Sequence, residues 1–188
     1  MAANKRKRNV EVEWPAATPL DLVRQDDLRA IRCLLARFLA RDHDKGAIDT
    51  LDQLDNAVKG LGVVVHNASK LAELSDPSLD VVKLAMSCAA KLVFYRVENI
   101  HILAQELVER LEQVREGAKV LSVSADTLTT HMPSYESDAA RCWGSYQAAC
   151  GAYDYAKTLV RRSEATLLPA ATAAIVAESI YKTAVEAQ

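Results

Sequence analysis

The pair of residues whose spacing is most typical of a metal site is Glu98 and His101. Positions i and i+3 share one face of a helix, so a Glu-x-x-His pair can give two ligands to one metal ion. A di-iron bundle needs a second such pair, and no other histidine here has a glutamate three residues before it. The pair also flanks the apolar positions Val97 and Ile100 instead of replacing them. We therefore predict no metal centre and place the pair at the edge of a core.

The remaining reactive side chains do not form a known catalytic pattern. Asp42, His43 and Asp44 are more simply explained as a polar connection between helices than as a cation site. No glycine-rich phosphate loop, H-E-x-x-H or G-x-S-x-G motif is present. We predict a protein that is not an enzyme and has no catalytic residues and no cofactor. The four cysteines lie far apart without a C-x-x-C pair, which predicts buried, reduced thiols in an intracellular protein: Cys33, Cys88, Cys142 and Cys150.

Large aromatic residues alternate with very small ones between residues 142 and 153. Glycine and alanine at helical spacing let another helix approach closely, and tyrosine and tryptophan suit contacts that are partly hydrated. Two interpretations stay open, namely packing within the chain and a surface for self-association or a partner. The residues of this predicted interaction face are Trp143, Gly144, Tyr146, Gly151 and Tyr153.

A run of four basic residues, Lys5, Arg6, Lys7 and Arg8, stands near the start of an otherwise acidic chain. The rest of the sequence contains 19 basic and 25 acidic residues, and the net charge of the whole chain is −2. The run is compatible with a nuclear import signal, with an arm that contacts nucleic acid weakly, or with a solubilising tail. We predict that residues 1–17 form a flexible basic arm and residues 18–188 one helical-bundle domain.

The elements that must position these residues are helices. Glycine and proline are scarce, at six and five residues, and no strand pattern competes with the helical one. Thr18-Pro19 is typical of a helix start, and apolar residues recur at helical spacing from Leu20 to Phe38 and from Ile48 to Ala72. The polar run 41–46 separates these two segments, and Ser75-Asp76-Pro77 follows them.

The third segment carries the most regular apolar pattern of the chain. Steps of three and four alternate with one additional step of four, which indicates a heptad seam with a single stutter. Unbroken, such a helix would be about 80 Å long at 1.5 Å per residue. The seam comprises Leu79, Val82, Met86, Ala89, Val93, Val97, Ile100, Ala104, Leu107, Leu111, Val114, Ala118, Leu121, Ala125, Leu128 and Met132.

A fourth helix is predicted from Ser134, and Pro169 is predicted to end or kink it before a final alanine-rich helix. Its predicted seam is Tyr135, Ala139, Cys142, Tyr146, Ala149, Tyr153, Ala156 and Val160. The breaks divide the chain into segments 19–74, 77–131 and 135–188, and short connections make neighbours antiparallel. We predict an all-α, elongated antiparallel bundle of three long coiled-coil-like rods with about five helices.

No signal peptide or transmembrane segment is predicted, since the longest uncharged run in the helical part, 165–177, has 13 residues and contains Pro169. We expect an intracellular protein, cytoplasmic or nuclear. The pattern favours a non-enzymatic structural or scaffolding protein that forms homo-oligomers and binds a protein partner. Two alternatives are a nucleic-acid packaging protein, of coat or nucleocapsid type, and a helical module that binds a membrane surface.

Overall fold

The computed structural model of the chain describes residues 25–36, 45–72, 79–132, 134 and 136–186. Over these residues the fold is all-α, and its four helices form a bundle. The predicted arm with Lys5, Arg6, Lys7 and Arg8 lies outside the described residues, as do the predicted helix start at Thr18-Pro19 and the stop at 75–77. No described helix is long and apolar enough to cross a membrane.

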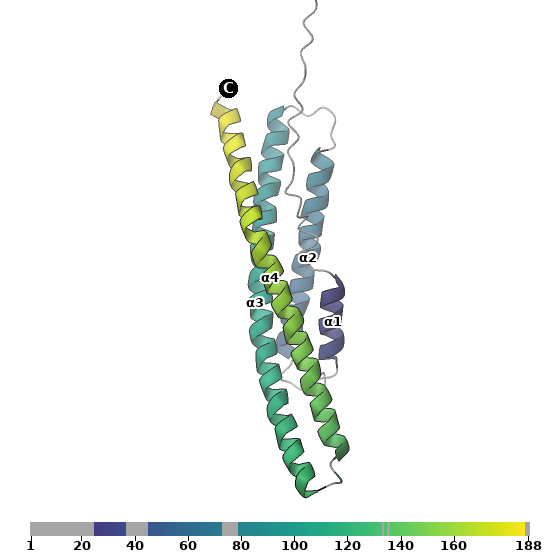
Figure 1. The fold of residues 1–188 in the computed structure, drawn as a ribbon. Helices are drawn as coiled ribbons and strands as arrows, with labels where there is room; N and C mark the ends of the chain where they lie inside the picture. Colours follow the sequence, from purple (N-terminus) through teal and green to yellow (C-terminus); the bar gives the residue numbers. More distant parts are fainter. Residues whose placement is uncertain (1–24, 37–44, 73–78, 133, 135, 187–188) are drawn as a thin grey trace, which may run out of the picture.

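The bundle is built on two very long helices. The helices are α1 (Gln25–Leu35), α2 (Lys45–Ala72), α3 (Leu79–His131) and α4 (Glu136–Glu186), of 11, 28, 53 and 51 residues. Helices α3 and α4 run antiparallel along the length of the molecule, and the shorter α1 and α2 pack against part of that pair (Figure 1). The helix α2 begins at Lys45, so Lys45 and Gly46 belong to a helix and not to the predicted polar connection.

Between Ala89 and Ala118, the seam predicted for the third segment forms most of the buried face of α3. Val97, Ile100, Ala104, Leu107 and Leu111 are fully shielded from solvent. The helix is continuous from Leu79 to His131, because its only glycine, Gly117, is tolerated within a long packed helix. The predicted all-α bundle is therefore confirmed, whereas coiled-coil geometry of the rods stays a prediction.

Helix α4 differs from the prediction in two respects. It continues through Pro169, so the predicted end at this residue is wrong and the predicted count of about five helices is not confirmed. Proline removes one backbone hydrogen bond, but Ala170 and Ala174 are buried on the inner face and help hold this part of the helix in place. The buried line is also displaced from the predicted seam: Ala152, Leu159 and Ser163 are fully buried, whereas Tyr153 and Val160 are only partly so.

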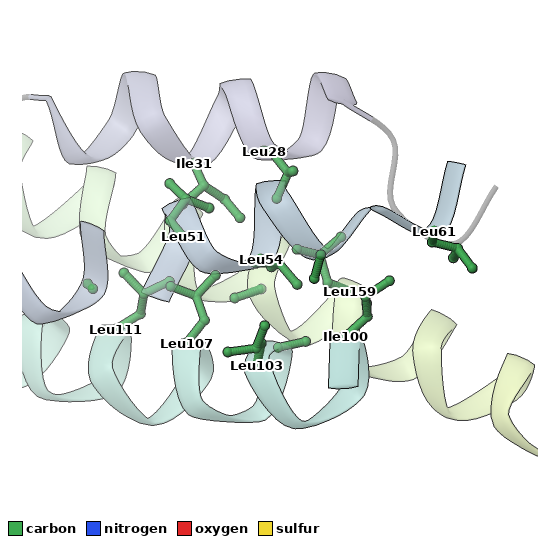
Figure 2. Close-up of a cluster of buried hydrophobic side chains, with 14 of the residues drawn as sticks. Leu28, Ile31, Leu51, Leu54, Leu61, Ile100, Leu103, Leu107, Leu111 and Leu159 are labelled. Atoms are coloured by element: carbon green, nitrogen blue, oxygen red, sulfur yellow. The ribbon is translucent and has the colours of Figure 1, made fainter. Parts of the chain in front are cut away.

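One hydrophobic core joins all four helices where they overlap. Leucine and isoleucine side chains from α1, α2 and α3 meet leucine and alanine side chains of α4 (Figure 2). The alanines on α4 keep its backbone close to its neighbours, and the large side chains opposite fill the space. The labelled members of this core are Leu28, Ile31, Leu51, Leu54, Leu61, Ile100, Leu103, Leu107, Leu111 and Leu159.

The short helix α1 is held by its apolar face and by ion pairs at its edges. Asp27, whose side chain is 15% exposed, pairs with Arg162 of α4. On the other side Arg32 lies 2.6 Å from Asp52 of α2. Isolated helices of this length are marginal in water, so α1 depends on these contacts with α2 and α4.

We expect Leu107→Ala to lower the free energy of unfolding by about 2–5 kcal/mol, because it opens a cavity in a fully buried site. Ile102→Ala on the same helix is the matched control: Ile102 is 55% exposed, and its loss should change stability by less than about 0.5 kcal/mol. Urea unfolding followed by circular dichroism measures both. Equal effects of the two substitutions would contradict the placement of the core.

We expect Asp27→Asn to lower stability by about 1–2 kcal/mol, since the Arg162 guanidinium loses a partly buried charged partner. The neighbouring pair Asp26–Arg29 is exposed and separated by 3.7 Å, so Asp26→Asn should cost less than about 0.5 kcal/mol. The same unfolding experiment compares them. A cost for Asp26→Asn as large as that for Asp27→Asn would argue against the docking of α1 on α4.

Candidate interaction surface

The α3–α4 pair extends beyond the ends of the two shorter helices. Near the start of α2, Gly46 lies beside the Arg110 guanidinium of α3, and near the end of α1, Leu34 contacts Gly151 of α4. We call the part beyond these contacts, residues 119–132 of α3 and 136–147 of α4, the hairpin tip. Among the described helices, α3 and α4 have only each other at this level (Figure 1).

The seam of α3 continues into the hairpin tip but is no longer covered there. Ala118 is 6% exposed and packs on Ala148 and Ala149 of α4. The next seam positions that carry large side chains are 39% exposed at Leu121, 52% at Leu128 and 54% at Met132. These positions continue the three-and-four spacing of the buried seam, but the buried side chain of the α3 tip is Ser122, so Leu121 and Leu128 lie beside the buried line of the helix.

Four of the five hydroxyl side chains of the α3 tip are hydrogen-bonded within the helix, and the fifth, Ser122, is buried. Each of the four donates to the backbone carbonyl four residues earlier, at 2.8–3.1 Å. A hydroxyl that is bonded in this way does not need a new partner when it is covered, so this surface is less costly to bury than its composition suggests. The four residues are Ser124, Thr127, Thr129 and Thr130.

The hairpin tip also carries few charges. Residues 119–147 contain five charged side chains, and Asp138 and Arg141 form an ion pair at 2.8 Å. A shallow, open hollow of about 540 Å³ lies here. The described residues that border it all belong to α3, and they are Val123, Asp126, Thr127, Thr129, Thr130 and His131. A weakly charged, partly apolar surface of this kind is typical of a contact with another helix.

Two residues of the predicted interaction face lie at the hairpin tip and point outward. Trp143 is 53% exposed, and its ring lies 5.6 Å from that of Tyr146. A methyl group added at Gly144 would contact none of the described side chains. The thiol of Cys150 hydrogen-bonds the Tyr146 phenol and raises its pKa above the ordinary value. Trp143 and Gly144 are thus available to another molecule.

The other three residues of that face pack within the chain, and Tyr146 does so against Ala118, Ala148 and Ala149. A methyl group at Gly151 would lie 3.3 Å from Leu34 Cδ1, so this glycine lets α1 approach α4 closely. The Tyr153 ring is covered by the Arg115 guanidinium at 4.3 Å and by the Lys157 ammonium at 5.2 Å. Within residues 142–153, Trp143 and Gly144 therefore face outward, whereas Gly151 and Tyr153 contact other side chains of the molecule.

The Glu98–His101 pair does not converge on a third ligand. Glu98 is exposed, whereas His101 Nδ1 lies 2.9 Å from Ser163 Oγ of α4. The serine hydroxyl donates to the Val160 carbonyl at 2.9 Å, so the histidine donates to the serine. Within the described ranges no three histidine, cysteine, aspartate or glutamate residues are placed to hold a metal ion.

Sequence reasoning missed Ser163, although a signal for it exists. Ser163 is fully buried and follows the buried Ala156 by seven residues, which places it on the inner face of α4. Its hydroxyl links α3 and α4 through His101. A serine at the same helical spacing as the buried alanines therefore indicates a polar contact inside the bundle.

The four cysteines are free, but the prediction that they are buried is wrong. Cys33 and Cys88 are exposed, and Cys142 and Cys150 are partly exposed. The bundle buries a narrow stripe of each helix, and these positions fall beside the stripe.

In comparisons with known proteins, no family model, no curated protein and no solved structure matches this chain. The function is therefore argued from the geometry of the chain.

We expect Gly144→Ala to raise the free energy of unfolding by about 1 kcal/mol, because alanine is the better helix former and the added methyl group meets no described neighbour. Gly151→Ala is the matched variant seven residues further along the same helix. The added methyl group would lie 3.3 Å from Leu34 Cδ1, so the free energy of unfolding should rise less than for Gly144→Ala or should fall. Thermal unfolding compares the two, and a larger gain at Gly151 would contradict the close approach of α1.

Proposed function

We propose that the protein is a non-enzymatic helical scaffold that forms homo-oligomers and binds a protein partner through coiled-coil-like rods. The observation that carries the proposal is the uncovered seam at the hairpin tip, where Leu121, Leu128 and Met132 are 39–54% exposed. A seam of this spacing in a stable assembly is covered by another helix. We place the scaffold inside the cell, in the cytoplasm or the nucleus, since its described cysteines are free.

A second apolar surface at the opposite end of the α3–α4 pair supports partner binding. Leu168 is 75% exposed and Ile175 is 69% exposed on α4. Nearby charges are satisfied: Glu178 pairs with Lys91 at 3.1 Å and with Lys182 at 3.2 Å. Hydrogen bonds from these two lysines lower the pKa of the Glu178 carboxyl, so the carboxylate keeps its charge to a lower pH than an ordinary glutamate. A rod with apolar surfaces at both ends can join more than one molecule.

The nucleic-acid alternative receives less support from the described helices. In that hypothesis the arginines of the first helix line the strand, but Arg29 lies 3.7 Å from Asp26 and Arg32 lies 2.6 Å from Asp52. Charges paired in this way are less available to phosphate groups. The same mixing of charges disfavours a basic membrane-binding face, and the arm at residues 5–8 is outside the described part of the chain.

We expect the purified full-length protein to sediment as an oligomer at tens of micromolar. Apolar surfaces of this kind associate with little dependence on salt, so the mass should be similar at low and high ionic strength. Sedimentation velocity with absorbance at 260 and 280 nm measures mass and nucleic-acid content on one sample. A monomer at this concentration would contradict the proposal, and oligomers that dissociate on nuclease treatment would favour the packaging alternative.

A further inference from the structure

We propose that the hairpin tip of one chain docks on the hairpin tip of a second copy. The two α3–α4 pairs would then form one four-helix bundle around their uncovered seams. This inference rests on the proposed function and deepens it, because it names the surface and the occupant.

The cross-section of the molecule indicates how many helices are missing at the tip. At the level of Leu107 and Leu111, α1 and α2 join α3 and α4 in one hydrophobic core, and both side chains are fully buried. Near the C-terminal end of α3, α4 is the only described helix beside it (Figure 1), and Leu128 in this part is 52% exposed. A second hairpin tip brings two helices, which is the number that α1 and α2 supply in the middle of the bundle.

The rest of this chain is attached away from the tip. Residues 1–24 precede α1, whose N-terminal part pairs through Asp27 with Arg162, in the middle of α4. The C-terminal ends of α2 and α4 and the start of α3 lie at the opposite end of the molecule (Figure 1). The segment 37–44 is bound on both sides by the ends of α1 and α2. The parts of α2, α3 and α4 that lie at the opposite end therefore do not cover the seam at the tip.

The chemistry of the tip fits a copy of itself. A two-fold contact places the same residues against each other, so a strongly charged surface would repel its copy. Here Asp138 and Arg141 neutralise one another, and only three other charged side chains lie between residues 119 and 147. The back-bonded hydroxyls of the α3 tip can be covered without leaving donors unpaired. Its apolar side chains are leucine, valine and methionine, which pack against each other in bundle cores.

The test compares Leu128→Asp with Ile102→Asp in the full-length protein. The two side chains are 52% and 55% exposed on the same helix, but only Leu128 belongs to the hairpin tip. A two-fold contact contains the substitution twice, so we expect Leu128→Asp to raise the dissociation constant of the oligomer by about 100-fold or more. Ile102→Asp should leave it unchanged. Sedimentation gives the constants, and circular dichroism verifies that both variants keep the helical content of the wild type.

A cross-linking experiment identifies the occupant independently of stability. Leu128 is replaced with p-benzoylphenylalanine, and equal amounts of ¹⁴N- and ¹⁵N-labelled protein are mixed and illuminated. Mixed-isotope cross-links to residues 117–147 support the proposal. Cross-links within one copy to residues 1–24 would overturn it by showing that the N-terminal segment covers the seam.

The remaining outcomes separate this inference from the proposed function. A wild type that associates with the same constant as Leu128→Asp overturns the tip contact but leaves the scaffold proposal in place. A wild type that stays monomeric at tens of micromolar overturns both.

Discussion

The fold depends on one constraint: an apolar seam on a long helix needs a helix against it along its whole length. Helices α3 and α4 have 53 and 51 residues, whereas α1 and α2 have 11 and 28. The shorter helices therefore complete the bundle only in part of the molecule. Burial follows this inequality closely, since the α3 seam is fully shielded from Val97 to Leu111 and progressively exposed from Leu121 to Met132.

Where all four helices overlap, small and large apolar side chains have different roles in packing. On α4 the inner face is mostly alanine, including Ala149, Ala152 and Ala156, so the helix backbones approach closely. On α3 the same levels carry leucine and isoleucine, which fill the space between the helices. Between the described helices, the polar contact of Ser163 with His101 lies inside the bundle, and ion pairs such as Asp27–Arg162 lie at its edges. Such a bundle obtains its stability mainly from apolar burial, and its polar contacts fix the position of the helices.

The sequence allowed the helical class and the seam of α3 to be predicted, because a strict alternation of three and four over many turns has no competing explanation. Prediction from the sequence failed where a local preference was overridden by packing between the helices. Pro169 is a strong local stop signal, but packing of the neighbouring Ala170 and Ala174 maintains the helix across it. Of the predicted α4 seam, Ala149 and Ala156 are fully buried, but Tyr153 and Val160 are only partly buried, whereas Ala152 and Ser163 beside the predicted seam are fully buried. The interaction face stays a prediction. Trp143 is exposed and a methyl group at Gly144 would meet no described neighbour, whereas Gly151 lies beside Leu34 of α1, and the position of a neighbouring helix is not encoded in the local pattern.

The central claim is that the seam at the hairpin tip is uncovered in the single chain and needs a helical partner. Hydrogen exchange of the α3 amides, followed by mass spectrometry over a range of protein concentrations, tests it most directly. The account predicts weak protection of residues 119–131 in dilute protein, a rise in that protection with concentration, and constant strong protection of residues 97–111. Protection of residues 119–131 that equals that of residues 97–111 in a sample shown to be monomeric would contradict it.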